Sequence, residues 1–191
     1  MRKIDLNKKM AIAQSVFELV QTQGIVNLSM AKIAKLANVS VRTIYIYYQD
    51  KEDLLGQLYL AVKLKIDAGL AEQLATTADL FEQLAVTIAH FAQAYNRWPN
   101  EMIYMRAIQQ NPELVSHEVH KQTLAIALPI FQMYERMQAS VDFKHLPVET
   151  FTAIAAGAMN MMIEQAIVCG RPISEEQIAV LIVATQDAVR A

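Results

Sequence analysis

The sequence has one cysteine, Cys169, and only five glycines and five prolines in 191 residues. A single cysteine excludes a disulfide framework and a cysteine-based zinc site. Glycine and proline together make up about 5% of the chain, under half of average usage, which excludes a turn-rich β-sandwich or barrel. No signal-peptide core follows Arg2 and Lys3, and apolar runs such as 178–184 are far shorter than the roughly 18 to 20 residues that span a bilayer. These absences predict a soluble, cytoplasmic protein without a membrane partner.

What the chain does contain is apolar side chains (54%) with a moderate share of charge (19%), enough for a core and too little charge for a disordered chain. The net charge of -2 is spread unevenly. Residues 1–51 carry eight basic and three acidic residues, a net of +5, so the other 140 residues sum to -7. A basic segment is the electrostatic footprint expected of DNA binding, although a solvated basic face gives the same count. Two interpretations likewise fit Arg2, Lys3, Lys8 and Lys9: a solvated tail, or an arm that lies near DNA.

Apolar residues recur at helical spacing along most of the chain, which predicts an all-α fold of about nine helices. Ser29 and Ser40 are expected N-caps, and Ser174 with Gln177 forms a capping box. Pro129 predicts a kink or a break because it removes a backbone hydrogen bond. The expected helices cover residues 8–23, 29–37, 41–48, 50–70, 79–97, 99–110, 111–139, 147–169 and 174–189.

The segment 29–48 has the pattern of two short helices joined by a tight turn. Asn38 tolerates the left-handed backbone of such a turn, and Ser40 can cap the helix that follows. Ala34 is small enough to lie where the two helices cross, and Ile44 would fill the space between them. In a helix-turn-helix the second helix enters the DNA major groove, so the pattern predicts DNA binding.

The run from Ser29 to Leu55, SMAKIAKLANVSVRTIYIYYQDKEDLL, resembles the DNA-binding signature of tetracycline-repressor (TetR) type regulators. The resemblance covers residues 8 to about 60, with Asn38 where the family usually has glycine. It implies a DNA-binding domain over 1–50 and a helical effector-binding and dimerisation domain over 51–191. The function that it implies is a homodimeric, ligand-responsive repressor that binds an inverted-repeat DNA operator and is released by a small-molecule effector.

The resemblance also assigns roles to residues of this recognition segment. Thr43, Tyr45 and Tyr47 match positions that touch phosphate or bases, and Lys51 matches a phosphate-contacting lysine. Arg42 is expected to select sequence, because a guanidinium can pair bidentately with guanine. Tyr45 suits a phosphate contact and packing on neighbouring helices equally well. Tyr48 is expected in the core. The predicted DNA-binding residues are Ser29, Ser40, Val41, Arg42, Thr43, Tyr45, Ile46, Tyr47 and Lys51.

Large, adaptable side chains gather in the middle of the chain, where they would suit either a core or an apolar ligand pocket. The resemblance implies such a pocket, for a small apolar or aromatic effector and without a cofactor. The predicted lining is Phe91, Tyr95, Trp98, Met102, Met105, Phe131, Tyr134 and Met159. The last two helices are too apolar to face water together, and the resemblance implies that they pair with a second copy. The predicted dimer residues are Ala155, Met159, Met162, Ile163, Ile178, Leu181 and Ile182.

Few other residues suggest metal binding or catalysis. Glu113, His117 and His120 share one helix face at i, i+4, i+7, which suits either a divalent metal or an exposed polar surface, so no metal site is predicted. Cys169 is expected to be buried as a small apolar residue. The alternative functions are an all-α dimeric small-molecule-binding protein or an enzyme without DNA binding. Catalysis would require that two groups meet in one cleft, from among His90, His117, His120, Glu164 and Cys169.

Overall fold

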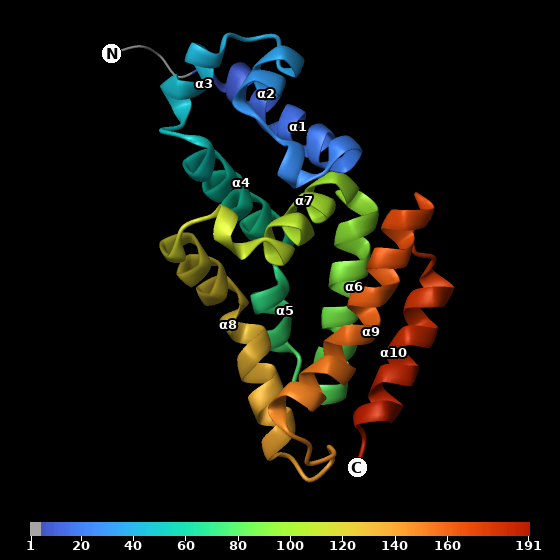
Figure 1. Ribbon diagram of the computed structural model, residues 1–191. Helices are drawn as coiled ribbons and strands as arrows, with labels where there is room; N and C mark the ends of the chain where they lie inside the picture. Colours follow the sequence, from blue (N-terminus) through green and yellow to red (C-terminus); the bar gives the residue numbers. More distant parts are fainter. Residues whose placement is uncertain (1–4) are drawn as a thin grey trace. The chain divides into compact units, whose positions relative to one another are not determined.

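The computed structural model describes residues 5–191, and within that range the chain is helical throughout, without a β-strand (Figure 1). The all-α expectation is confirmed. The α-helices are α1 (Leu6–Gln23), α2 (Met30–Leu36), α3 (Val41–Tyr47), α4 (Lys51–Ile66), α5 (Leu70–Thr76), α6 (Leu80–Arg97), α7 (Pro99–Gln110), α8 (His117–Ala139), α9 (Val148–Cys169) and α10 (Glu175–Val189). Single 3-10 turns, Ile25–Asn27 and Pro112–Leu114, precede α2 and α8.

The predicted caps explain where several helices begin and end. The Ser29 hydroxyl accepts from the Lys32 N–H (3.3 Å), and the Ser40 hydroxyl accepts from the Thr43 N–H (3.1 Å). At α10, the Ser174 hydroxyl and the Gln177 side chain form the reciprocal capping box. These local side-chain acceptors satisfy backbone donors that a helix leaves unpaired at its start.

Three boundaries differ from the sequence expectations. The fourth helix ends at Ile66, and α5 follows after Gly69, whose positive φ of 82° breaks the helical path. The helix expected from residue 111 starts at His117 instead, because Pro112–Leu114 forms a separate 3-10 turn. Pro129 lies inside α8, which continues to Ala139, so the predicted break does not occur.

The chain forms two compact units. Unit 1 contains the residues up to Leu64 together with Asn100–Thr123, and unit 2 contains Lys65–Pro99 together with Leu124–Ala191. Both α4 and α8 therefore continue from one unit into the other along the sequence. The functional division after residue 50 remains a prediction.

Unit 1 is built around buried aromatic side chains that tie α7 to α1 and α4. The Tyr104 hydroxyl, fully buried, donates to the Leu55 carbonyl of α4 (2.6 Å). Its ring lies 5.1 Å from the ring of Phe17 on α1. Burial raises the pKa of Tyr104 well above its ordinary value, and the neighbouring Tyr48 and Tyr59 raise it further. Tyr104 thus joins α7 to α1 and α4 in the core of unit 1.

Unit 2 is a layer of helices in which α6 packs against α5, α9 and α10. The Asn96 side chain, near the end of α6, exchanges two hydrogen bonds of 2.8 Å with the backbone of Ile173. At the opposite end, the Gln186 amide donates to the Phe81 carbonyl (2.8 Å). The two ends of α6 are therefore fixed to the segment that carries α10.

Candidate DNA-binding surface

The turn between α2 and α3 has the geometry that the sequence predicts. Asn38 adopts a positive φ of 51°, a conformation that asparagine tolerates better than most residues. The Val39 N–H then donates to the Ala34 carbonyl (2.9 Å), which closes the turn. Ile33 and Ile44 are fully buried between the helices. This packing fixes α3 by its inner face and leaves its outer face uncovered.

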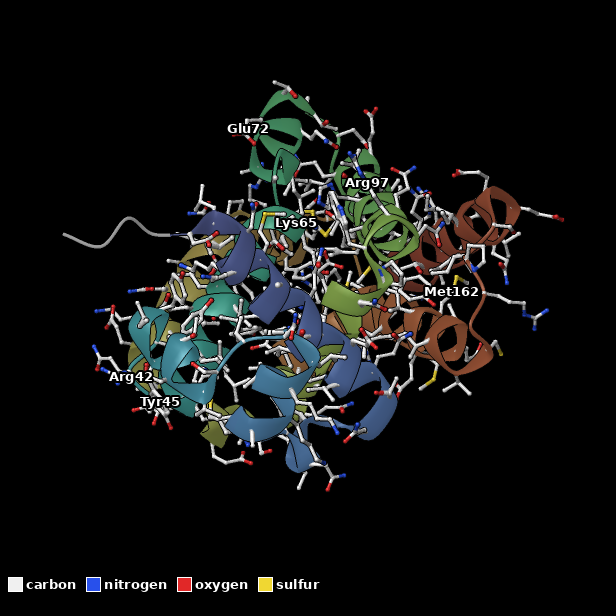
Figure 2. The ribbon with its side chains drawn as sticks, turned by 90° about the horizontal axis from the view of Figure 1, so that it is seen from above. Arg42, Tyr45, Lys65, Glu72, Arg97 and Met162 are labelled. Atoms are coloured by element: carbon white, nitrogen blue, oxygen red, sulfur yellow. The ribbon has the colours of Figure 1, made fainter. Side chains whose placement is uncertain are left out.

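The outer face of α3 carries large side chains that the described residues of unit 1 leave uncovered. Tyr45 and Ile46 are 53% and 50% exposed, and Arg42 is exposed beside them. Figure 2 shows Arg42 and Tyr45 projecting together from α3, away from the other helices of this unit. Exposed aromatic and apolar side chains next to a guanidinium form a surface suited to base edges and thymine methyl groups.

The remaining predicted contact residues are partly engaged within the chain. The Thr43 and Ser40 hydroxyls lie 2.8 Å apart, and the Tyr47 hydroxyl donates to the Asp5 carbonyl over 3.4 Å. Lys51 begins α4, where the sequence suggests that free backbone N–H groups attract phosphate. In the structure the Asp53 N–H donates instead to the Asp50 carboxylate (2.8 Å). This N–H is therefore occupied, and the Lys51 side chain supplies the positive charge at the start of α4.

Tyr48 is in the core, as expected, with 1% of its surface exposed. Its hydroxyl has no hydrogen-bond partner among the described residues. Burial, and secondarily the charge of Asp53, raises the pKa of Tyr48 to about 12. Tyr48 is thus a core residue at the C-terminal end of α3.

Three other bases of the N-terminal segment, Lys8, Lys9 and Lys32, have intramolecular partners. Lys8 pairs with Asp5 (3.4 Å), and the Lys9 ammonium lies 5.6 Å from the ring centre of Tyr48. The Lys32 ammonium donates to the side chain of Gln23 (2.9 Å) and to a backbone carbonyl. Arg2 and Lys3 lie outside the described residues.

The eight predicted ligand residues are spread over both units, and their role in binding stays a prediction. Six of them are buried, while Trp98 is half-buried and Phe131 is 43% exposed. Met102 and Met105 belong to unit 1, and the other six belong to unit 2. The two cationic side chains of Lys65 and Arg97 lie over Trp98, at 4.8 and 4.7 Å from its ring centre. Burial raises the pKa of Tyr134 to about 12.

Three cavities are present that the sequence does not identify. In unit 2, a groove of about 720 Å³ lies between α5 and α8, and a hollow of about 260 Å³ lies between the end of α9 and the start of α10. In unit 1, a hollow of about 320 Å³ lies between the first turns of α4 and α8 and is lined by three carboxylates, Asp50, Glu52 and Asp53. None of the eight predicted ligand residues lines any of these cavities.

The predicted dimer residues mostly face inward. Met162 and Ile182 are half-exposed, whereas Ala155, Met159, Ile163, Ile178 and Leu181 are buried within the chain. The apolar side chains that are exposed on α9 and α10 are not among the predicted dimer residues; they include Met161, Val168, Val180 and Val183. By length and composition alone, α9 is also a candidate membrane span, with a mean hydropathy of 1.3 and 22% of that window buried. A helix covered by protein passes the same test.

The groups weighed for metal binding or catalysis do not converge. Among the described residues no three histidine, cysteine or acidic side chains are placed to hold a metal ion, and Nε2 of His120 lies 2.8 Å from the Pro112 carbonyl. Nε2 of His90 lies 2.7 Å from the Ile66 carbonyl. The prediction that Cys169 is buried is wrong: it is exposed, on the last turn of α9, where it lines the open hollow between α9 and α10. None of the three cavities contains two of the five groups considered for catalysis.

Comparison with known proteins also points to the segment that contains α2 and α3. Residues 15–58, which include α2 and α3, match the profile of a family described as bacterial regulatory proteins, tetR family. A relative from Haemophilus influenzae, described as an uncharacterized HTH-type transcriptional regulator, is 31% identical over 113 residues. That match covers 57% of this chain and spans about half (54%) of the relative.

Solved structures extend the similarity in fold to the whole chain. A TetR family transcription regulator from Marinobacter aquaeolei has a TM-score of 0.84 at 22% identity, with 100% of this chain and 99% of that chain covered. The regulator FadR from Bacillus subtilis, solved in complex with stearoyl-CoA, has a TM-score of 0.68 at 19% identity, with 94% and 96% covered. Residues 15–58, which hold α2, α3 and the turn at Asn38, thus match the tetR family of bacterial regulatory proteins, and the whole chain shares the fold of these solved regulators.

Proposed function

We propose that this protein is a homodimeric transcriptional repressor that reads an inverted-repeat operator with α3 and leaves it when a small molecule binds to unit 2. The observation that carries the proposal is the outer face of α3. There Arg42, Tyr45 and Ile46 are exposed together on a helix held in place by a capped turn. Exposed side chains of this size on a fixed helix fit the major groove.

A second copy would cover the apolar outer faces of α9 and α10. Residues with exposed or half-exposed side chains recur along α9 at alternating spacings of four and three: Ile154, Ala158, Met161, Gln165 and Val168. This is the spacing of a helix seam that packs against another helix. On α10, Val180 and Val183 are also more than half exposed. A two-fold axis through these helices would give a four-helix interface and set two copies of α3 about 34 to 36 Å apart, one turn of DNA.

Effector release would act through the helices that continue from one unit into the other. Both α4, which follows α3 directly, and α8 cross the boundary between the units. An effector that binds more tightly to the form with misplaced recognition helices shifts the population to that form, by no more than its difference in affinity. The similar fold of FadR, solved with stearoyl-CoA, supports an effector with a substantial apolar part.

Duplex binding by point variants tests the recognition surface. Duplexes selected from a random library are titrated with the parent chain and with Arg42→Ala, Lys51→Ala and, as a control that removes one charge from α8, Lys121→Ala. Arg42→Ala should relax the preference at one base-pair position, and Lys51→Ala should weaken binding to all sequences and reduce the salt dependence by about one counterion. The control should bind like the parent. Parent-like binding by both α3–α4 variants contradicts the proposed surface.

A further inference from the structure

The groove between α5 and α8 in unit 2 has two unlike walls. On the α5 side the lining is small and apolar: Ala71, Leu74 and Ala75, which share one helix face, followed by Ala78. On the α8 side it is Pro129, Gln132, Glu135 and Arg136, with the Thr77 segment closing one end. At about 720 Å³ the groove is within the size range of small-molecule sites.

The guanidinium of Arg136 is held in position by a chain of hydrogen bonds that starts in the core. The Gln83 side chain is 1% exposed, and its amide N–H donates to the Thr77 carbonyl (2.5 Å). The Gln83 carbonyl oxygen in turn accepts from the Arg136 guanidinium (2.7 Å), and Nε of Arg136 donates to the Gln132 backbone carbonyl (3.4 Å). Although Arg136 is exposed, its guanidinium is thus anchored at one point by a buried amide whose own position is fixed.

No carboxylate neutralises this cation in the part of the chain that the structure describes. Arg136 contacts an amide and a backbone carbonyl, and Glu135 lines the same groove without an ion pair to it. A guanidinium has five N–H donors in a planar fork that matches a carboxylate, and two of them are used here. The remaining donors are available for an anion at the edge of an apolar groove.

We propose that this groove binds an amphipathic molecule with a single carboxylate, whose charged end meets Arg136 and whose apolar chain lies along Ala71, Leu74 and Ala75. One positioned cation fits one negative charge, and the nearby Glu135 disfavours a second. The seven residues of α5 give a floor of about 10 Å, the length of a chain of about eight to ten carbons. The inference rests on the proposed function, because it names the effector class and the place in unit 2 where it binds.

Direct calorimetric binding to the DNA-free full chain tests the site, with decanoate as the probe. Decanoate should bind, whereas decanol and decylamine, which share its chain without its charge, should bind at least about tenfold more weakly. Arg136→Met, which keeps an unbranched side chain and removes the charge, should cause a similar loss. Glu135→Gln is the matched control on the same helix and should bind decanoate as tightly as the parent or more tightly.

A second variant tests the apolar wall of the groove. Ala75→Leu fills the groove and leaves Arg136 intact, so it should also abolish decanoate binding, and thermal unfolding of each variant shows that it is folded. Equal binding of decanol and decanoate, or unchanged binding by Arg136→Met or by Ala75→Leu, would overturn the inference, and so would an absence of decanoate binding to the parent. These outcomes leave operator binding by the ligand-free chain untouched, and it is the failure of operator binding that would overturn the proposed function.

Discussion

Replacing Gly56 with alanine tests how closely α4 is held against the first turn of α8. A Cβ at this position would lie 2.9 Å from Cγ2 of Val119, closer than carbon atoms pack. Val119 is β-branched and stiff at its first side-chain torsion, so it cannot swing aside freely. In an open helix the substitution would stabilise by about 1 kcal/mol, because glycine is a poor helix former. Overpacking of this kind costs about 1 to 3 kcal/mol, which leaves a net destabilisation of about 1 kcal/mol.

The measurement is the free energy of unfolding by urea, in both the parent and a Val119→Ala background. Gly56→Ala should lower the free energy of unfolding of the parent by about 1 kcal/mol, a fall in Tm of about 2 to 4 °C for a chain of this size. In the Val119→Ala background the obstructing methyl is gone, so the same substitution should stabilise by up to about 1 kcal/mol. All samples are compared at one protein concentration, because association shifts apparent stability. Stabilisation by the same amount in both backgrounds would refute the close contact.

Three further predictions concern buried or strained positions. Tyr104→Phe removes the hydroxyl that donates to the Leu55 carbonyl over 2.6 Å, and should lower the free energy of unfolding in urea by about 1 kcal/mol; an unchanged midpoint contradicts this. Asn38→Ala should cost about 1 kcal/mol in the same assay because φ is 51°, whereas Asn38→Gly should cost nothing or stabilise; equal effects of the two would contradict the turn geometry. Burial raises the pKa of Tyr48 and of Tyr134 to about 12, so the unfolded chain loses these protons near pH 10 while the folded chain keeps them. The free energy of unfolding should therefore keep this contribution in full well below pH 10 and fall by about 1.4 kcal/mol per tyrosine between pH 9 and pH 11. Tyr134→Phe should reduce this fall.

The features that sequence predicts well here depend on a few adjacent residues. The turn at Asn38 and the caps at Ser29, Ser40 and Ser174 follow from local sterics and from side-chain acceptors within three residues. The outer face of α3 follows from helical periodicity once Ile44 is assigned to the core. These parts of the candidate DNA-binding surface needed no knowledge of the rest of the fold.

The features that sequence does not predict depend on contacts between distant residues. Apolar spacing alone does not separate a ligand pocket from a core, and the buried positions of Phe91 and Tyr95 suit either role. The groove at α5 and α8 is defined instead by Arg136, which is oriented by Gln83, 53 residues earlier in the chain. Cys169 has apolar neighbours in sequence, yet it is exposed because it borders the open hollow between the end of α9 and the start of α10. A pattern can show that a helix is apolar, but not which molecule covers it.

The most direct test of the account is the selection of duplexes by the full chain from a random library, with the stoichiometry of the selected complex determined by mass. The account predicts an enriched inverted repeat whose half-sites are centred about 10 to 10.5 base pairs apart, or a multiple of that spacing, with an even number of chains on each duplex. Enrichment should fall at one position of each half-site when Arg42→Ala is used. A selection without enrichment, or the same enriched sequence from Arg42→Ala, would contradict the central claim that α3 reads DNA.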